Sequence, residues 1–166
     1  ECRYPLPEGA DIMLEGRSRE PSSSPHARAW EFSEKPTEER WKFFQEELSR
    51  CIRCNACRQA CPTCYCKECF ADQTRPRWVS IGNDIADVMA FHIGRIIHQA
   101  GRCIECDACV RACPMDIDLR PFTNLIAKDI EELFDYIPGH SLEENPPLLV
   151  FDENDDGLVT EPNEQD

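Results

Sequence analysis

The chain has 166 residues, a net charge of −14 and 12 cysteines, and its charge is unevenly distributed. Residues 51–113 carry a net charge of +2, whereas residues 114–166 carry −13. This distribution argues against non-specific binding of nucleic acid or of anionic membranes. No apolar run reaches the roughly 18 residues that a membrane-spanning helix needs. We therefore expect no nucleic-acid partner and no membrane insertion.

The first predicted elements are an arm and a helix. Residues 1–36 are rich in proline and serine and predict an extended arm or linker with little core of its own. Thr37 is a residue type that caps helices, and Trp41, Phe44 and Leu48 follow it on one face of a 3.6-residue period. This pattern predicts a helix that leads directly into the first cysteine-rich segment.

Two further helices are predicted downstream. Residues 84–100 carry apolar side chains at helical spacing, and Asn83 or Asp84 is the expected cap. The next helix is expected to begin near Pro121, because proline is favoured in a first helical turn, and to end before Pro138. Together with the helix before the first cysteine, these elements dominate the predicted secondary structure.

Strand signals are scarce. Residues 78–81 and 148–151 are the two candidates. The predicted architecture is therefore mainly α, with a cysteine-rich domain over residues 37–138 that follows the arm. Residues 139–166 are expected to form an acidic C-terminal tail.

One motif occurs twice. The strings CIRCNACRQACP at residues 51–62 and CIECDACVRACP at residues 103–114 agree at eight of twelve positions, including every cysteine and the proline. Both have the spacing C-x2-C-x2-C-x3-C-P. Three thiolates two residues apart can reach three iron corners of one 4Fe–4S cluster from a single loop, and the fourth cysteine then lies on the chain that leaves the loop.

Disulfides and zinc explain this pattern less well. A disulfide scaffold is typical of small secreted domains that cannot bury a sufficient core, and this chain is long enough to bury one. Zinc sites need four ligands each, commonly as separated C-x2-C pairs, and the triple spacing fits them poorly. The two motifs therefore predict two 4Fe–4S clusters.

The two motifs resemble those of bacterial-type dicluster ferredoxins, in which the fourth cysteine of each motif binds the cluster of the other motif. The resemblance implies two crosswise ligand sets. The first consists of Cys51, Cys54, Cys57 and Cys113. The second consists of Cys103, Cys106, Cys109 and Cys61.

A second resemblance concerns the fold. The long spacer between the motifs is similar to that of the α-helical ferredoxin domain in fumarate reductase, succinate dehydrogenase and heterodisulfide reductase subunits. The longer string CRQACPTCYCKECFADQTRPRW resembles iron–sulfur subunits of formate dehydrogenase, hydrogenase and heterodisulfide-reductase-type complexes. An α-helical ferredoxin domain is the fold that this implies. An α+β bacterial-ferredoxin fold with a helical insert is the alternative.

Four cysteines remain outside the two ligand sets: Cys2, Cys64, Cys66 and Cys69. They are enough for a third metal site, which would hold either another cluster or zinc. The alternative is that some of them are buried apolar side chains beside the clusters, because free cysteine is among the most buried residue types.

No residue pattern predicts chemistry on a substrate, since neither a phosphate-binding loop nor a dinucleotide fingerprint occurs. The expected function is non-catalytic relay of single electrons within a multi-subunit anaerobic oxidoreductase. Its partners would be larger redox subunits, including a flavin- or cluster-containing protein, in a cytoplasmic hetero-oligomer. A freely diffusing ferredoxin and a thiol-rich metal-binding adaptor are the alternatives.

Overall fold

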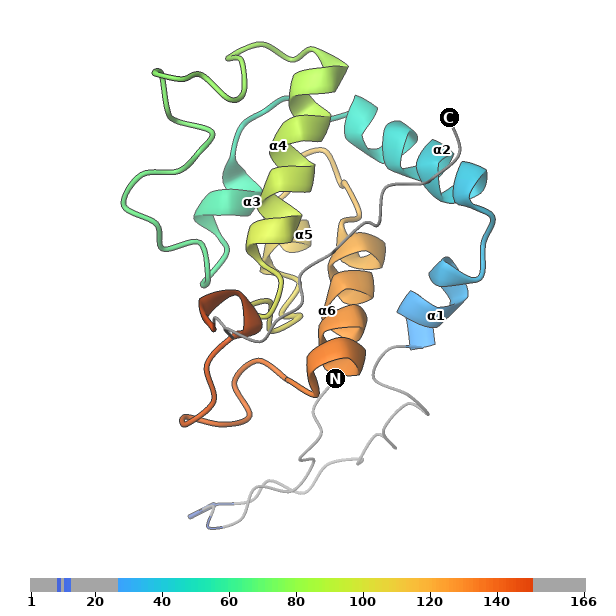
Figure 1. Cartoon of the computed structure of the whole chain (residues 1–166). Helices are drawn as coiled ribbons and strands as arrows, with labels where there is room; N and C mark the ends of the chain where they lie inside the picture. Colours follow the sequence, from blue (N-terminus) through green and yellow to red (C-terminus); the bar gives the residue numbers. More distant parts are fainter. Residues whose placement is uncertain (1–8, 10, 13–26, 151–166) are drawn as a thin grey trace, which may run out of the picture.

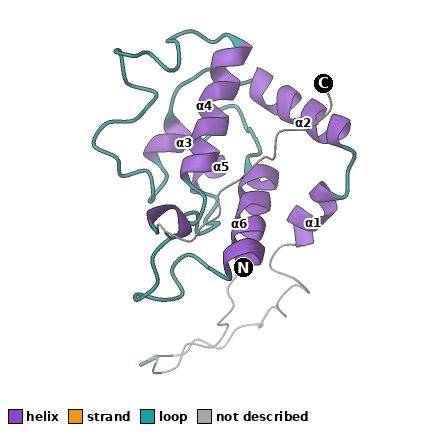
Figure 2. Ribbon diagram, in the orientation of Figure 1, coloured by secondary structure: helices purple, strands orange, loops and turns teal. Residues whose placement is uncertain are grey.

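The computed structural model describes residue 9, residues 11–12 and residues 27–150. Within these residues the chain forms six α-helices and one short 3-10 helix, and no strand (Figures 1 and 2). The α-helices are α1 (Ala27–Ser33), α2 (Thr37–Ser49), α3 (Ala56–Gln59), α4 (Ile85–His98), α5 (Ala108–Arg111) and α6 (Arg120–Phe134). The mainly α prediction is confirmed, and none of the described helices is long and apolar enough to cross a membrane.

The central helix α4 forms close to the predicted place. Asp84 is its N-cap, and the carboxylate accepts a hydrogen bond from the backbone amide of Ala86 at 2.9 Å. The chain turns away at Gly101, whose φ of +69° is a conformation that glycine adopts without steric cost. For α2 the predicted cap is wrong, because Pro36 occupies the capping position and Thr37 is the first helical residue.

Other local predictions need correction. The third predicted helix ends at Phe134 rather than just before Pro138, because Asp135 adopts a left-handed φ of 50°. Residues 78–81 form no strand, and residues 147–149 form a 3-10 helix in the second candidate segment. Phe151 and the acidic residues after it lie outside the described part of the chain.

Helix α1 lies within the stretch that the composition predicts to be an extended arm. It packs on α6, and it buries Ala29 and Phe32. The Phe32 ring meets the rings of Phe43 and Phe122 edge-on, with centroids 5.6 and 5.5 Å apart. These aromatic contacts attach α1 to both α2 and α6.

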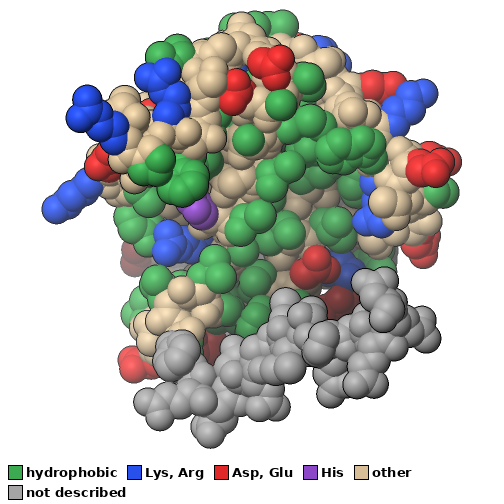
Figure 3. Space-filling view, turned by 45° about the horizontal axis from the view of Figure 1, so that its top comes forward, with side chains coloured by type: hydrophobic (Ala, Val, Ile, Leu, Met, Phe, Trp, Pro, Cys, Tyr) green, Lys and Arg blue, Asp and Glu red, His purple; other side chains and the backbone are tan. Residues whose placement is uncertain are grey.

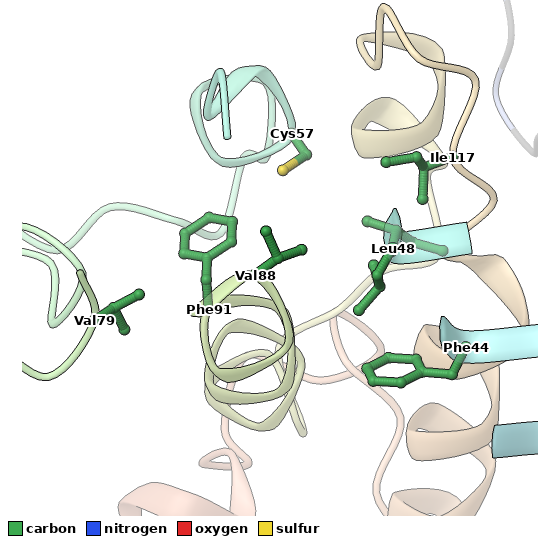
Figure 4. Close-up of a cluster of buried hydrophobic side chains, with 8 residues drawn as sticks. Phe44, Leu48, Cys57, Val79, Val88, Phe91 and Ile117 are labelled. Carbon is green, nitrogen blue, oxygen red and sulfur yellow. The ribbon is translucent and has the colours of Figure 1, made fainter. Parts of the chain in front are cut away.

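The main core lies where α2, α4 and the two motif loops meet (Figure 4). Leu48 is fully buried and Val88 and Phe91 are 1 % exposed. Cys57 of the first motif belongs to the same cluster, on the side of Phe91 and Val88. The core therefore holds the first motif directly against α4.

Hydrogen bonds also join the two halves of the chain. The amide of Asp118, which follows the second motif, donates to the carboxylate of Glu47 in α2 at 2.7 Å. The Arg50 guanidinium donates to the backbone carbonyl of Asp116 at 3.3 Å. The segment before the first motif is thereby fastened to the segment after the second.

Candidate functional site

The two motifs fold into matching loops. In each loop the residues two and four positions after the first cysteine have positive φ: Arg53 and Asn55 in one loop, Glu105 and Asp107 in the other. Asn and Asp tolerate this left-handed conformation better than other non-glycine residues. A short helix follows in both copies, and α3 and α5 pack against each other. The sequence repeat is therefore a structural repeat.

Backbone amides in each loop donate to cysteine sulfurs in the same pattern. The amides of Arg53 and Glu105 donate to the first cysteine of their own motif, Cys51 and Cys103. The distance from the Arg53 amide to the Cys51 sulfur is 3.4 Å. N–H donors aimed at sulfur stabilise thiolates, which are the form of cysteine that binds metals.

Four cysteines of the first expected set line one small cavity: Cys51, Cys54, Cys57 and Cys113. Three come from one loop, and Cys113 comes from the other motif. Both Cys113 and Cys54 lie close enough to Cys51 for their charges to raise its pKa, although burial is the largest cause. The structure therefore brings together the four cysteines that the resemblance groups as the first ligand set.

The second expected set is brought together in part. Burial raises the pKa of Cys103 to about 11, and the neighbouring charges of Cys109 and Cys61 contribute to the rise. The charge of Cys61 also acts on Cys109. Cys106, the remaining member of this set, lies exposed at the surface, as does Cys54 in the first set.

The two sets adjoin at the third cysteine of each motif. Cys57 and Cys109 lie within electrostatic reach of each other, and burial raises the pKa of both thiols, that of Cys57 to about 11. In both cases the positive charge of Arg95 opposes the rise. A buried thiol with a raised pKa holds its proton, so metal binding at these positions must displace protons.

The donor set fits 4Fe–4S clusters rather than a single ion. Among the described residues, no three His, Cys, Asp or Glu side chains are grouped so that they could hold one metal ion. A cubane places its four cysteines at separate iron corners, so its ligands need not converge on one point. The buried guanidinium of Arg95 beside these thiols also suits an anionic group, because an unpaired buried cation is costly.

Three of the surplus cysteines line another cavity, but they do not form a group that could hold one metal ion. Cys64, Cys66 and Cys69 line a cavity of about 510 Å³, while Cys2 lies outside the described residues. The Cys64 sulfur accepts a hydrogen bond from the side-chain amide of Gln99 at 3.2 Å. Its hydrogen bond with Cys61 lowers the pKa of Cys61 and raises that of Cys64.

Two site residues were not predicted from the motifs. His92 is 2 % exposed, and its Nε2 lies 3.4 Å from the Cys51 sulfur. Arg95 is 4 % exposed, and its Nη2 donates to the carbonyl of Cys57 at 3.0 Å. Both lie on the face of α4 that buries Val88 and Phe91, and a polar residue at a core position of a helix is the signal that points to them.

The helical fold and the paired cysteine loops define an iron–sulfur protein of the electron-transfer type. Residues 47–117 match the family described as "4Fe-4S dicluster domain". The resemblance to iron–sulfur subunits is thereby confirmed, as is the presence of 4Fe–4S chemistry.

The chain is also similar to curated proteins of methanogenic archaea. It is 36 % identical over 118 residues to the F420-dependent formate dehydrogenase subunit beta of Methanocaldococcus jannaschii, covering 70 % of this chain and 29 % of that protein. It is 30 % identical over 150 residues to the F420-dependent formate dehydrogenase 1 subunit beta of Methanococcus maripaludis, covering 90 % of this chain and 37 % of that protein.

A third relative is the polyferredoxin protein MvhB of Methanothermobacter marburgensis. It is 32 % identical over an alignment of 82 residues, which covers 40 % of this chain and 20 % of that protein. The chain thus spans about a third of the length of the formate dehydrogenase subunits that it matches.

Proposed function

We propose that the protein relays single electrons through two 4Fe–4S clusters as part of a larger anaerobic oxidoreductase of the formate dehydrogenase or hydrogenase type. The observation that carries the proposal is the meeting of the two motif loops, where Cys57 and Cys109 adjoin. Two clusters held by these neighbouring loops would suit the transfer of an electron from one cluster to the other. The names of the relatives support the class of complex.

The proposed ligands are crosswise. Cys51, Cys54, Cys57 and Cys113 hold one cluster, and Cys103, Cys106, Cys109 and Cys61 hold the other. The shared cavity of the first four supports this assignment, as does the proximity of Cys61 to Cys103. When bound, each cluster accepts and releases one electron.

The chain's own residues orient and shield these centres. The loop amides of Arg53 and Glu105 donate to sulfur, which stabilises the ligating thiolates. Phe91 and Ile117 cover the first cysteine set on its buried side and exclude water from it. The exposed second cysteines, Cys54 and Cys106, mark where each centre lies nearest to a partner.

Attachment to larger subunits is supported by the surface. Hydrophobic side chains gather across one face of the molecule (Figure 3). Large exposed hydrophobic residues include Trp41, Trp78, Ile81, Leu133 and Leu142. Exposed apolar surface of this kind favours stable contacts with other proteins. We propose a reducing cytoplasm as the setting, because free thiols are needed to load the clusters.

Purification of the tagged protein from its native anaerobic host tests this function. We expect recovery with larger redox subunits, about eight iron atoms per chain and two centres that are each reduced by one electron. Recovery as a lone monomer with both clusters would favour a diffusible ferredoxin instead. Absence of reducible iron–sulfur centres would end both proposals.

The surplus cysteines support a second candidate function, a thiol-rich adaptor with a third metal site. The supporting observation is that Cys64, Cys66 and Cys69 line one cavity together with His98, although in this structure they are not grouped closely enough to hold one ion. Iron and zinc analysis of the native protein tests it. Iron above about eight atoms per chain, or stoichiometric zinc, supports the third site, and about eight irons without zinc contradicts it.

Joint replacement of Cys64, Cys66 and Cys69 by serine is expected to leave both cubane signals intact in EPR spectra. The reason is that all three thiols lie outside the eight proposed ligands. Replacement of Cys57, Cys61 and Cys109 is the matched control and should abolish both signals. Loss of a cubane signal in the first variant would show that a surplus thiol is a ligand.

A further inference from the structure

Within the described part of the chain, Arg95 is a buried cation for which no ion pair with a carboxylate is found. It projects from α4 and is 4 % exposed, and Nη2 donates to the carbonyl of Cys57 at 3.0 Å. Its Nε and Nη1 have no hydrogen-bond partner among the described residues. A guanidinium in such a place costs several kcal/mol of desolvation unless negative charge lies nearby. The fold must therefore supply that negative charge.

The groups around this guanidinium are thiols from both motifs. Its charge interacts with Cys57 of the first proposed ligand set, with the surplus thiol Cys64, and with Cys109 and Cys61 of the second set. Cys57 and Cys109 also act on each other, so the guanidinium lies where the two sets adjoin. Because α3 packs on α5 at this point, one side chain from α4 reaches both sets.

Arg95 stays protonated, because the guanidinium of arginine is not deprotonated in proteins. The other fully buried polar group on this face of α4 is His92, whose Nε2 lies 3.4 Å from the Cys51 sulfur.

We infer that Arg95 is a positioning residue that holds one positive charge between the two cysteine sets and thereby raises the reduction potentials of both clusters. The inference rests on the proposed electron relay. Reduction adds negative charge to each cluster, and a fixed cation in a poorly solvated site stabilises the more negative state. A charge between the two centres acts on both, whereas one at the surface is screened by water and salt.

The test is redox-poised EPR of the full-length, anaerobically purified protein and its R95Q and R95K variants. We expect R95Q to lower both midpoint potentials. The expected change in each reduction equilibrium is at least tenfold, which is about 59 mV for one electron. R95K keeps the charge but moves it away from Cys57, because lysine lacks the planar fork, so both potentials should fall by a smaller amount.

The matched control is R111Q. Arg111 also donates to a cysteine carbonyl, that of Cys106 at 2.8 Å, but it is exposed. We expect both potentials of R111Q to stay close to those of the unmodified protein. An equal shift in R111Q and R95Q would overturn the inference, because net charge and not position would then be responsible.

The outcomes separate this inference from the proposed function. An unmodified protein without two one-electron centres refutes the relay itself. Two such centres with unchanged potentials in a fully loaded R95Q refute only the role of Arg95, and so does a shift confined to one cluster. If R95Q fails to bind its full iron, the comparison rests on R95M, a second variant that removes the charge, where full iron with no fall in either potential also overturns the inference.

Discussion

Replacement of Cys113 by serine is expected to remove one of the two clusters, namely the one whose other three ligands lie in the first motif. Iron should fall from about eight to about four atoms per chain, and one of the two EPR signals should disappear. The physical reason is the shared cavity that Cys113 forms with Cys51, Cys54 and Cys57. A substitution in the second repeat is thus expected to remove the cluster that is held mainly by the first repeat.

A combined variant decides between crosswise and local ligation. Joint replacement of Cys51 and Cys54 removes the first cluster under either arrangement. Adding the Cys113 replacement should cause no further iron loss if Cys113 serves that same cluster, so about four irons remain. If each motif instead binds its own cluster, the triple variant should lose all its iron.

The reciprocal variant is the control. Adding the Cys61 replacement to the Cys51 and Cys54 variant should remove both clusters, because Cys61 belongs to the second proposed set together with Cys103. Both combined variants lack three thiols, so any general damage to the fold is matched. Equal iron contents in the two triple variants would contradict crosswise ligation.

The motif spacing predicted more of this site than any other feature of the sequence. It predicted two matching loops as the places of metal binding, and Asn55 and Asp107 are the residue types that the left-handed turns of those loops favour. The helix Ile85–His98 could be predicted equally well from the sequence, because its N-cap residue and the helical spacing of its apolar residues indicate the same helix. Local sequence signals were therefore sufficient to predict the turns and the helix whose conformation depends on residues close together in the chain.

Features that depend on tertiary contacts could be predicted less well from the sequence. Helix α1 is short and weakly periodic, and it is held by Phe32 packing on residues far along the chain. The partner that decides the position of α1 is therefore distant in sequence, and no local pattern contains it. For Arg95, the helical period indicates that the residue lies on the apolar face of α4, but the thiols that it faces are distant in sequence.

Replacement of Leu48 by alanine is the strongest test of the core that supports the site. Leu48 is fully buried, and its carbonyl accepts the amide of Cys51 at 3.0 Å. Loss of the buried side chain should cost about 2–5 kcal/mol through lost burial and an added cavity. At about 2–4 °C per kcal/mol, the midpoint of thermal unfolding should fall by roughly 4–20 °C.

Leu133 is the matched control, since it is also a helical leucine but is 75 % exposed. Its replacement by alanine should change the stability by no more than about 0.5 kcal/mol. Thermal bleaching of the visible iron–sulfur absorbance, followed anaerobically, compares the two variants. Because Leu48 and Cys57 belong to the same core cluster and Cys51 packs against it, the first cluster should bleach before the second in L48A. Equal midpoints in the two variants would mean that the cysteine–iron bonds alone hold this part of the fold together.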